Sequence, residues 1–170
     1  PVADIRAGIL SIREKWEQIL KIPVTAQGEI LLFEWQGDVF RMPGNWIPSR
    51  DSVQGMLNAA RSGSLPEKEG RVLEYPWQLL QWADSLIRED FDLLTRHRIS
   101  QPVPPTVECL DPVAVFIEEG ARLRNCILNA STGPIYIGKN AEVMEGSLIR
   151  GPFALGEGSV LKMGCRVYGA

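Results

Sequence analysis

The last part of the chain, residues 137–170, repeats every six residues. An aliphatic residue opens each hexad, and a mostly small residue follows four positions later. The opening residues are Ile137, Val143, Ile149, Leu155, Leu161 and Val167. A period of six fits neither a helix, with about 3.6 residues per turn, nor hairpins, which recur at ~8–12 residues. It is the period of a three-sided parallel β-helix, in which each short strand buries its aliphatic residue only against neighbouring coils.

The repeat begins less regularly at Val113, and we predict a β-helix over residues 113–170 that is truncated at its end. Ile117 and Leu123 fit hexads whose phase differs by two residues from that of Ile137. We therefore predict an insertion between about Asn125 and Pro134. An insertion into a solenoid normally leaves the coil at a corner as a loop.

The first hundred residues predict an α/β part built from short elements. Ser11 and Glu14 have the spacing of a capping box, which predicts a helix within residues 1–22 that Pro23 ends. The other predicted elements are strands over 29–33, 39–42 and 71–74, a short helix over about 51–60, and a polar surface loop over 62–70.

A connector helix and a linker are predicted to separate this part from the β-helix. Apolar residues recur at helical spacing over residues 76–95. Residues 101–112 are Pro-rich, and Gly, Val and Ile dominate after them. We therefore divide the chain into residues 1–100, a linker over 101–112, and the β-helix over 113–170.

Composition narrows the classes of partner and compartment. The net charge of −3 and the pI of about 5.3 favour neither a nucleic acid nor an anionic membrane as partner. No apolar run approaches the ~20 residues of a membrane span. The three cysteines are odd in number and form no C-x-x-C pair, which predicts a reducing, cytoplasmic setting rather than a disulfide framework or a zinc site.

The ends of the chain predict a fragment of a longer protein. The sequence starts at Pro1, within a segment that is predicted to be structured, and stops four residues into a hexad. A solenoid that stops without a polar capping unit exposes backbone edge groups.

Three segments together resemble one protein family. They are PVADIRAGILSIREKW at 1–16, YPWQLLQWADSLIREDFDLLT at 75–95, and LNASTGPIYIGKNAEVMEGSLIRGPFALGEGSVLKMGCRVYGA at 128–170. The hexad tract resembles the left-handed parallel β-helix of bacterial acyltransferases and sugar nucleotidyltransferases. The three segments in this order resemble the GlmU-like sugar nucleotidyltransferases of the Bacteroidetes type.

The resemblance implies a fold and a reaction. The expected fold is a partial nucleotidyltransferase-like α/β part followed by a left-handed β-helix. The expected reaction of the full-length protein joins a nucleoside triphosphate to a sugar 1-phosphate and releases pyrophosphate, with Mg²⁺ bridging the phosphates. The β-helix resembles those that bind acetyl-CoA or acyl-CoA between the coils of a trimer, so a homotrimer is expected.

The resemblance also implies candidate site residues in the N-terminal part. Asp4 and Arg6 belong to the tail of the nucleotide-binding loop, where Arg6 would reach a phosphate and Asp4 would orient it; the alternative is that Asp4 and Arg6 form a surface or inter-helix ion pair. Asn45 follows Gly44 where active members place a metal-binding aspartate, and a neutral amide is a weaker ligand for a hard dication. Either Asp38 or Asp51 substitutes as metal ligand, or the domain is catalytically degenerate, with Asn45 serving a turn.

Other polar residues give weaker candidates. Four cations on the predicted coil surface would meet the phosphates of a nucleotide or CoA, or else are simply solvated: Lys139, Arg150, Lys162 and Arg166. His97 is the only histidine and lies before the linker, outside the coils that would carry a general base in a β-helix acyltransferase. Trp77 and Trp82 are predicted to pack, and Cys165 to lie in the core.

Three hypotheses about function follow. The first is part of a sugar-1-phosphate nucleotidyltransferase-like enzyme with an acyltransferase-like β-helix, a fragment that would be inactive alone. The second is a catalytically degenerate sugar-nucleotide-binding or scaffold protein that oligomerises through the β-helix, which the neutral Asn45 and the short N-terminal part favour. The third is a CoA-dependent acyltransferase. Fold alone does not decide among them, because function depends on the site.

Overall fold

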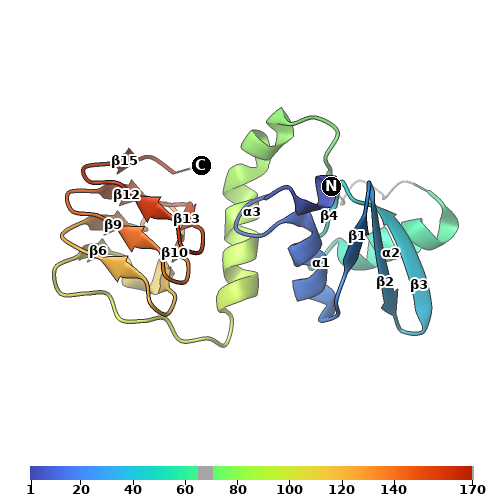
Figure 1. Ribbon diagram of the computed structural model, residues 1–170, viewed down its shortest axis with the longest axis horizontal. Coiled ribbons are helices and arrows are strands. Elements are labelled where there is room, and N and C mark those ends of the chain that lie inside the picture. Colours follow the sequence, from blue (N-terminus) through green and yellow to red (C-terminus); the bar gives the residue numbers. More distant parts are fainter. Residues whose placement is uncertain (65–70, 170) are drawn as a thin grey trace. The chain divides into compact units, whose positions relative to one another are not determined.

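The computed structural model describes residues 1–64 and 71–169 (Figure 1). It divides the chain into two compact units, Pro1–Trp82 and Ala83–Ala170. Within the described residues, no helix combines the length and the apolar character needed to cross a bilayer. Residues 65–70 of the predicted surface loop lie outside the described residues.

The first unit consists of helices and antiparallel strands. Its helical elements are η1 (Val2–Asp4), α1 (Ile12–Leu20), α2 (Val53–Ser62) and the start of α3 (Trp77–Thr95). Its strands are β1 (Thr25–Gln27), β2 (Ile30–Trp35), β3 (Asp38–Pro43), β4 (Trp46–Ile47) and β5 (Arg71–Val72). Strands β1, β2 and β3 form one antiparallel sheet, and β4 pairs with β5.

The predicted start of α1 is confirmed by its hydrogen bonds. The Ser11 amide donates to Glu14 Oε2 at 2.7 Å, and the Glu14 amide donates to Ser11 Oγ at 3.3 Å, which completes the capping box. Trp16 lies fully buried on the next turn, and its Nε1–H donates to the carbonyl of Trp46 at 3.0 Å. One face of α1 is therefore anchored to β4 by both apolar burial and a satisfied indole.

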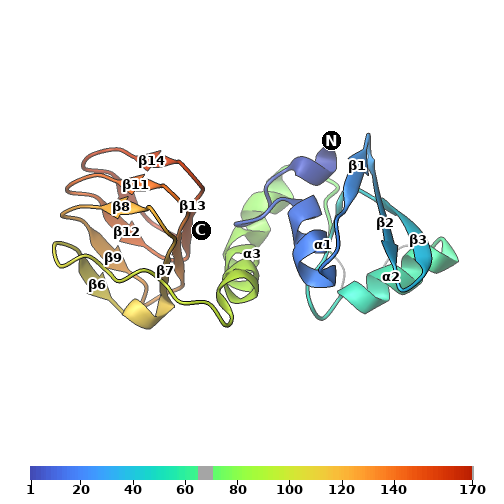
Figure 2. The ribbon, with the colours of Figure 1, turned by 60° about the horizontal axis from the view of Figure 1, so that its bottom comes forward.

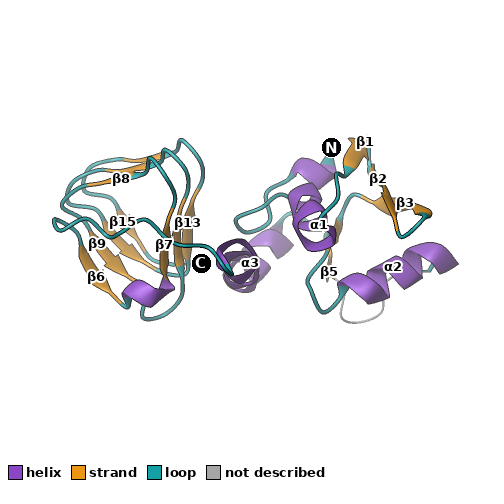
Figure 3. Cartoon of the chain, turned by 90° about the horizontal axis from the view of Figure 1, so that it is seen from below, coloured by secondary structure: helices purple, strands orange, loops and turns teal. Residues whose placement is uncertain are grey.

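The second unit contains the predicted left-handed parallel β-helix, made of three parallel sheets (Figures 2 and 3). One sheet joins β6 (Glu108–Leu110), β9 (Ile127–Asn129), β12 (Leu148–Arg150) and β15 (Arg166–Val167). The second joins β7 (Val115–Ile117), β10 (Ile135–Ile137) and β13 (Phe153–Leu155), and a short η2 (Pro112–Ala114) precedes it. The third joins β8 (Arg122–Leu123), β11 (Glu142–Val143) and β14 (Val160–Leu161).

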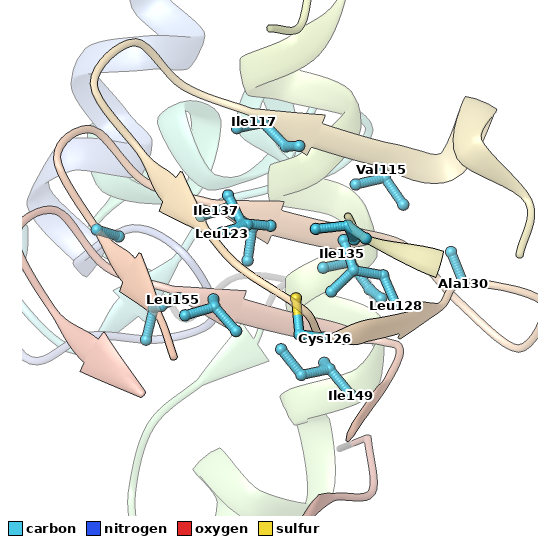
Figure 4. Packing of buried hydrophobic residues seen from close by; sticks show 13 residues of the cluster. Val115, Ile117, Leu123, Cys126, Leu128, Ala130, Ile135, Ile137, Ile149 and Leu155 are labelled. Atoms are coloured by element: carbon cyan, nitrogen blue, oxygen red, sulfur yellow. The ribbon is translucent and has the colours of Figure 1, made fainter. Parts of the chain in front are cut away.

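The hexads set the register between coils. Val143 pairs with Leu161, and Ile149 with Val167, so that one coil is three hexads long. Each aliphatic residue that opens a hexad therefore lies directly above the equivalent residue of the coil before it. Figure 4 shows these side chains converging in the interior, where Leu128, Ile135 and Ile137 are completely buried.

The phase shift between Leu123 and Ile137 has two parts. Leu128 follows Leu123 after five positions rather than six, and Ile137 follows Leu128 after nine, while their pairings along the sheets are kept. The predicted insertion is thus confirmed: the extra residues lie at the corner between β9 and β10. A shortening by one residue at the preceding corner accompanies it, and the sequence pattern did not reveal that compensation.

The β-helix begins earlier than residue 113. Strand β6 lies within the Pro-rich segment 101–112 and pairs in parallel with β9, with Cys109 opposite Leu128. Val107, just before it, is buried in the same apolar cluster. The hexad pattern missed this strand because Glu108 and Leu110 face outward and leave a single apolar residue between them.

The outer face of the β7-β10-β13 sheet is covered, unlike an ordinary solenoid side. Phe116 and Tyr136 alternate with inward-facing residues, yet both are buried, and their rings stack at 6.0 Å between centroids. Within residues 83–170, the later part of α3 runs beside this sheet (Figures 1 and 3). Arg88 on α3 donates to the carbonyl of Thr132 at 2.6 Å, at the corner beside the sheet.

A charged cluster closes the end of this covered face. Arg98 donates to both carboxylate oxygens of Glu118, at 2.7 and 2.8 Å, and its guanidinium lies 5.1 Å from the ring centroid of Phe116. The Tyr136 hydroxyl donates to Glu118 at 2.6 Å. Burial opposes the charged carboxylate, but the hydrogen bonds from Arg98 and Tyr136 outweigh it and lower the pKa of Glu118. Burial, followed by the bond to Glu118, raises the pKa of Tyr136.

We expect Glu118→Gln to destabilise the protein by about 1–2 kcal/mol at pH 7, because the ion pair with Arg98 is lost and one of the two accepting oxygens becomes an NH₂ group that cannot accept. The folded pKa of Glu118 lies below its unfolded value, so its contribution is complete above the unfolded pKa and is lost as pH falls through the folded pKa. Urea titrations at a series of pH values should therefore show the difference from wild type shrinking in acid. Glu119→Gln, at the exposed neighbour, is the control; an equal effect there would contradict the prediction.

Gly138 allows two coils to approach closely. A Cβ at this position would lie 2.8 Å from the backbone of Leu155, Gly156 and Glu157 in the next coil. We expect Gly138→Ala to destabilise the β-helix by about 1–3 kcal/mol, because the contacting atoms are backbone and cannot rotate away. Equilibrium denaturation followed by circular dichroism measures this effect. Gly55→Ala is the matched control, since nothing lies within 4 Å of that Cβ within α2 and alanine favours a helix; destabilisation of both variants would refute the steric argument.

Candidate functional site

The two residues predicted to contact a phosphate are each engaged within the first unit. Asp4 accepts a hydrogen bond from Arg13 Nε at 2.8 Å, and Arg6 donates to the carbonyl of Ile9. The bond to Asp4 raises the pKa of Arg13. Asp4 therefore forms a surface ion pair with Arg13, and the alternative interpretation, an ion pair between Asp4 and Arg6, is wrong in its partner.

Asn45 joins two strands. Its side-chain Nδ2 donates to the carbonyl of Leu73 at 3.1 Å, and its own carbonyl accepts from the amide of Leu73 at 2.8 Å. These two bonds continue the β4–β5 ladder, in which Trp46 pairs with Val72. An aspartate carboxylate could not take over the role of the Asn45 side-chain nitrogen, because a carboxylate only accepts hydrogen bonds.

The structure does bring the Asp4 and Asn45 segments close together. A Cβ built on Gly44 would lie 3.2 Å from the Cβ of Ala3, so the first turn of the chain packs against the turn between β3 and β4. The sequence prediction grouped these segments through the family resemblance. Their proximity here results from close packing at Gly44, where a Cβ would meet its neighbours at less than an ordinary contact distance.

The two weaker candidates for a metal ligand, Asp38 and Asp51, have different surroundings. Asp38 pairs with Arg61 at 2.5 Å, and the guanidinium of Arg61 lies 5.2 Å from the ring centroid of Phe40. Asp51 is exposed in the turn before α2. Among residues 1–64 and 71–169, no group of three or more His, Cys, Asp or Glu side chains is placed to hold a metal ion. Mg²⁺ prefers carboxylate oxygen, and a donating Asn45 amide with an arginine-bound Asp38 does not fit such a site.

The structure also places His97 and Trp77, which the sequence singled out, and a buried cysteine. His97 has a left-handed backbone, with φ of 65°, just after α3 ends. Trp77 does not pack as predicted: its side chain is 57% exposed and stacks on Tyr75 with 4.5 Å between ring centroids. Cys126 is buried in the β-helix core, and burial raises its pKa to about 11, so this thiol is not a nucleophile at neutral pH.

A groove lies on the outer face of the β9-β12-β15 sheet. Its volume is about 280 Å³. The lining residues are Ile127, Asn129, Leu148, Ile149, Arg150, Arg166, Val167 and Tyr168. Of the surface cations that the sequence singled out, the structure brings Arg150 and Arg166 together here, whereas Lys139 and Lys162 are exposed outside the lining.

The sheet register arranges the groove in columns. Ile127, Leu148 and Arg166 are opposite one another on successive strands, and Asn129 is opposite Arg150. The outward-facing side chains occupy every second position of each strand, and the inward-facing Ile149 and Val167 lie between them in the lining. The sequence signal existed, since an outward residue flanks each buried one, but the groove emerges only once the coils are aligned.

The charges in the groove are unbalanced. Within residues 1–64 and 71–169, neither Arg150 nor Arg166 has an ion-pair partner. Elsewhere on the β-helix the arginines are paired, Arg122 with Glu142 and Arg124 with Glu145. None of the eight residues that line the groove carries a carboxylate. The groove therefore presents uncompensated positive charge on a chain whose net charge is −3.

No family model matches the chain, and no curated protein or solved structure matches it either.

We expect Asn45→Asp to destabilise the first unit by about 1–3 kcal/mol, because the new carboxylate faces the carbonyl of Leu73 and leaves it without a donor. Thermal unfolding with and without Mg²⁺ measures both stability and metal binding. Asp51→Asn, at an exposed position, should leave stability within about 0.5 kcal/mol of wild type. A rise in melting temperature of the Asn45→Asp variant with Mg²⁺ would instead reveal a metal site that the substitution restores.

Proposed function

We propose that this chain is the non-catalytic scaffold of a protein that handles sugar nucleotides, related to the GlmU-like sugar nucleotidyltransferases. In this proposal, residues 1–100 are a shortened nucleotidyltransferase-like part that no longer transfers nucleotides, and the β-helix assembles the protein into a homotrimer. The proposal is the second of the three hypotheses that the sequence raised.

The contacts of Asn45 support the loss of catalysis. Its side chain and its main chain both bond to Leu73, so the position where an active member would hold a metal instead ties β4 to β5. Asp38 is similarly engaged by Arg61. A residue whose donors hold two strands together is not available to a metal ion without breaking those bonds.

The uncovered sides of the β-helix support a role in assembly. Val160, on the outer face of the β8-β11-β14 sheet, is 44% exposed, and Met163 beyond it is 69% exposed. The same sheet presents Arg122 beside Glu142, a pair of opposite charges that a second copy can complement. Exposed apolar residues beside a pair of opposite charges suit packing against a different side of a neighbouring copy, which is the head-to-tail contact that closes a ring of three.

The test is made on the full-length protein. We expect no pyrophosphate release with Mg²⁺ and any pair from a panel of nucleoside triphosphates and sugar 1-phosphates, and a trimer by analytical ultracentrifugation. Val160→Glu should shift the trimer toward monomer, because it places a charge in the apolar contact, whereas Val39→Glu, exposed on β3, should not. Turnover with one substrate pair would establish the nucleotidyltransferase hypothesis instead. Acetyl transfer from acetyl-CoA would establish the acyltransferase hypothesis.

A further inference from the structure

We propose that the groove on the β9-β12-β15 sheet binds a small soluble phosphomonoester, with Arg150 and Arg166 on the phosphate and Ile127 and Leu148 against an apolar part of the same molecule. This site is separate from the scaffold role and does not depend on it. Four observations support it: charge, donor chemistry, the apolar floor and volume.

The charges match a dianion. Arg150 and Arg166 lie on adjacent strands and two positions apart along them, so their backbones are roughly 8 Å from each other by sheet geometry. Both side chains are long enough to converge on one anion between them. A phosphomonoester carries about −1.5 to −2 charges at neutral pH and three terminal oxygens, whereas a carboxylate carries one charge and two oxygens. Two guanidiniums without a neighbouring carboxylate therefore favour the phosphate.

The polar side chain beside the arginines is oriented as a donor. Asn129 Oδ1 accepts from the Ser131 amide at 3.1 Å and from the Ser131 hydroxyl at 2.6 Å. Because its oxygen is held by these two bonds, Asn129 offers the groove its NH₂ group and not its acceptor. Tyr168 lines the same groove and adds a hydroxyl. Every polar side chain that lines the groove can therefore donate to an oxyanion.

The floor and the volume limit the rest of the ligand. Ile127 and Leu148 are neighbours on adjacent strands, and Leu148 is 40% exposed although it belongs to a regular sheet. An apolar ring or chain that covers them would gain from burial. A volume of about 280 Å³ lies at the lower limit of ligand sites, which suits a phosphate with one ring and is too small to enclose a whole CoA or a dinucleotide.

The experiment uses phenyl phosphate as the probe and isothermal titration calorimetry in low salt with the protein of residues 1–170. We expect binding that is about ten-fold weaker in Arg150→Ala and in Arg166→Ala, since each loses a charge-assisted hydrogen bond. Arg124→Ala is the matched control, because that arginine does not line the groove and pairs with Glu145, and it should bind as wild type does. Leu148→Ala should weaken binding of phenyl phosphate but not of inorganic phosphate.

Further probes separate the phosphomonoester from other anions. Phenol, benzoate and diphenyl phosphate, which lack the dianion, should each bind at least about ten-fold more weakly than phenyl phosphate. Circular dichroism confirms that the variants fold, and Arg150→Gln and Arg166→Gln replace any alanine variant that does not. Equal binding of phenyl phosphate by wild type and both arginine variants, equal loss in Arg124→Ala, or binding of benzoate as tight as phenyl phosphate would each overturn the proposal. Tighter binding to vesicles containing phosphatidic acid than to phenyl phosphate would also overturn it, in favour of a lipid surface.

This outcome is distinguishable from that of the scaffold proposal. Pyrophosphate release and sedimentation report on nucleotidyl transfer and trimer formation, while calorimetry with phenyl phosphate reports only on the groove. Each result can therefore fail without the other.

Discussion

The structure of the second unit depends on the alignment of one coil directly above the next. Parallel backbone hydrogen bonds, such as that from the Ile127 amide to the carbonyl of Ser147, hold successive coils together. They place each buried aliphatic residue against the equivalent residue of the coil below, so the apolar core is continuous along the axis. A strand of two or three residues has no stability of its own, and here it is stable only because it is in register with the strands beside it.

This alignment also explains how the β-helix tolerates irregularity. Corners can gain or lose residues, because only the strands must remain in register. The corner between β9 and β10 gains residues and holds them with local bonds: Thr132 Oγ1 donates to the carbonyl of Gly151 at 2.6 Å, and Arg88 donates to the carbonyl of Thr132. Gly133 and Gly151 permit this contact, since a Cβ on Gly151 would lie 2.1 Å from the carbonyl oxygen of Gly133. The positions of the inserted residues are thus restricted by backbone approach between coils.

The sequence predicted those features that depend on period and local chemistry. The hexads, the capping box of Ser11 and Glu14, the connector helix and the insertion all follow from spacing along the chain, and the structure confirms them. Strands β1, β4 and β6 were missed, because each has two or three residues and is defined by its partner rather than by its own pattern. The groove was missed for a related reason. Arg150 and Arg166 are sixteen residues apart, and only the register of β12 with β15 makes them neighbours.

Because of the same register, the inward and outward faces of every strand have different roles. Inward positions are fully committed to packing, as the complete burial of Ile137 and Val143 shows, so substitutions there change stability. Outward positions carry no packing constraint unless something covers them. On the β7-β10-β13 side, α3 and the segment after it cover them, and Phe116 and Tyr136 have become a second apolar layer.

On the β9-β12-β15 side nothing within residues 83–169 covers the arginines of the groove, and desolvating two unpaired guanidiniums against an apolar neighbour would be costly. On the β8-β11-β14 side, the opposite charges of Arg122 and Glu142 attract each other and destabilise the protein little. Two like charges that lie close together on an uncovered face repel each other instead. An anion between Arg150 and Arg166 would remove that repulsion, which is why charge, more than shape, identifies this face as the one that binds a ligand.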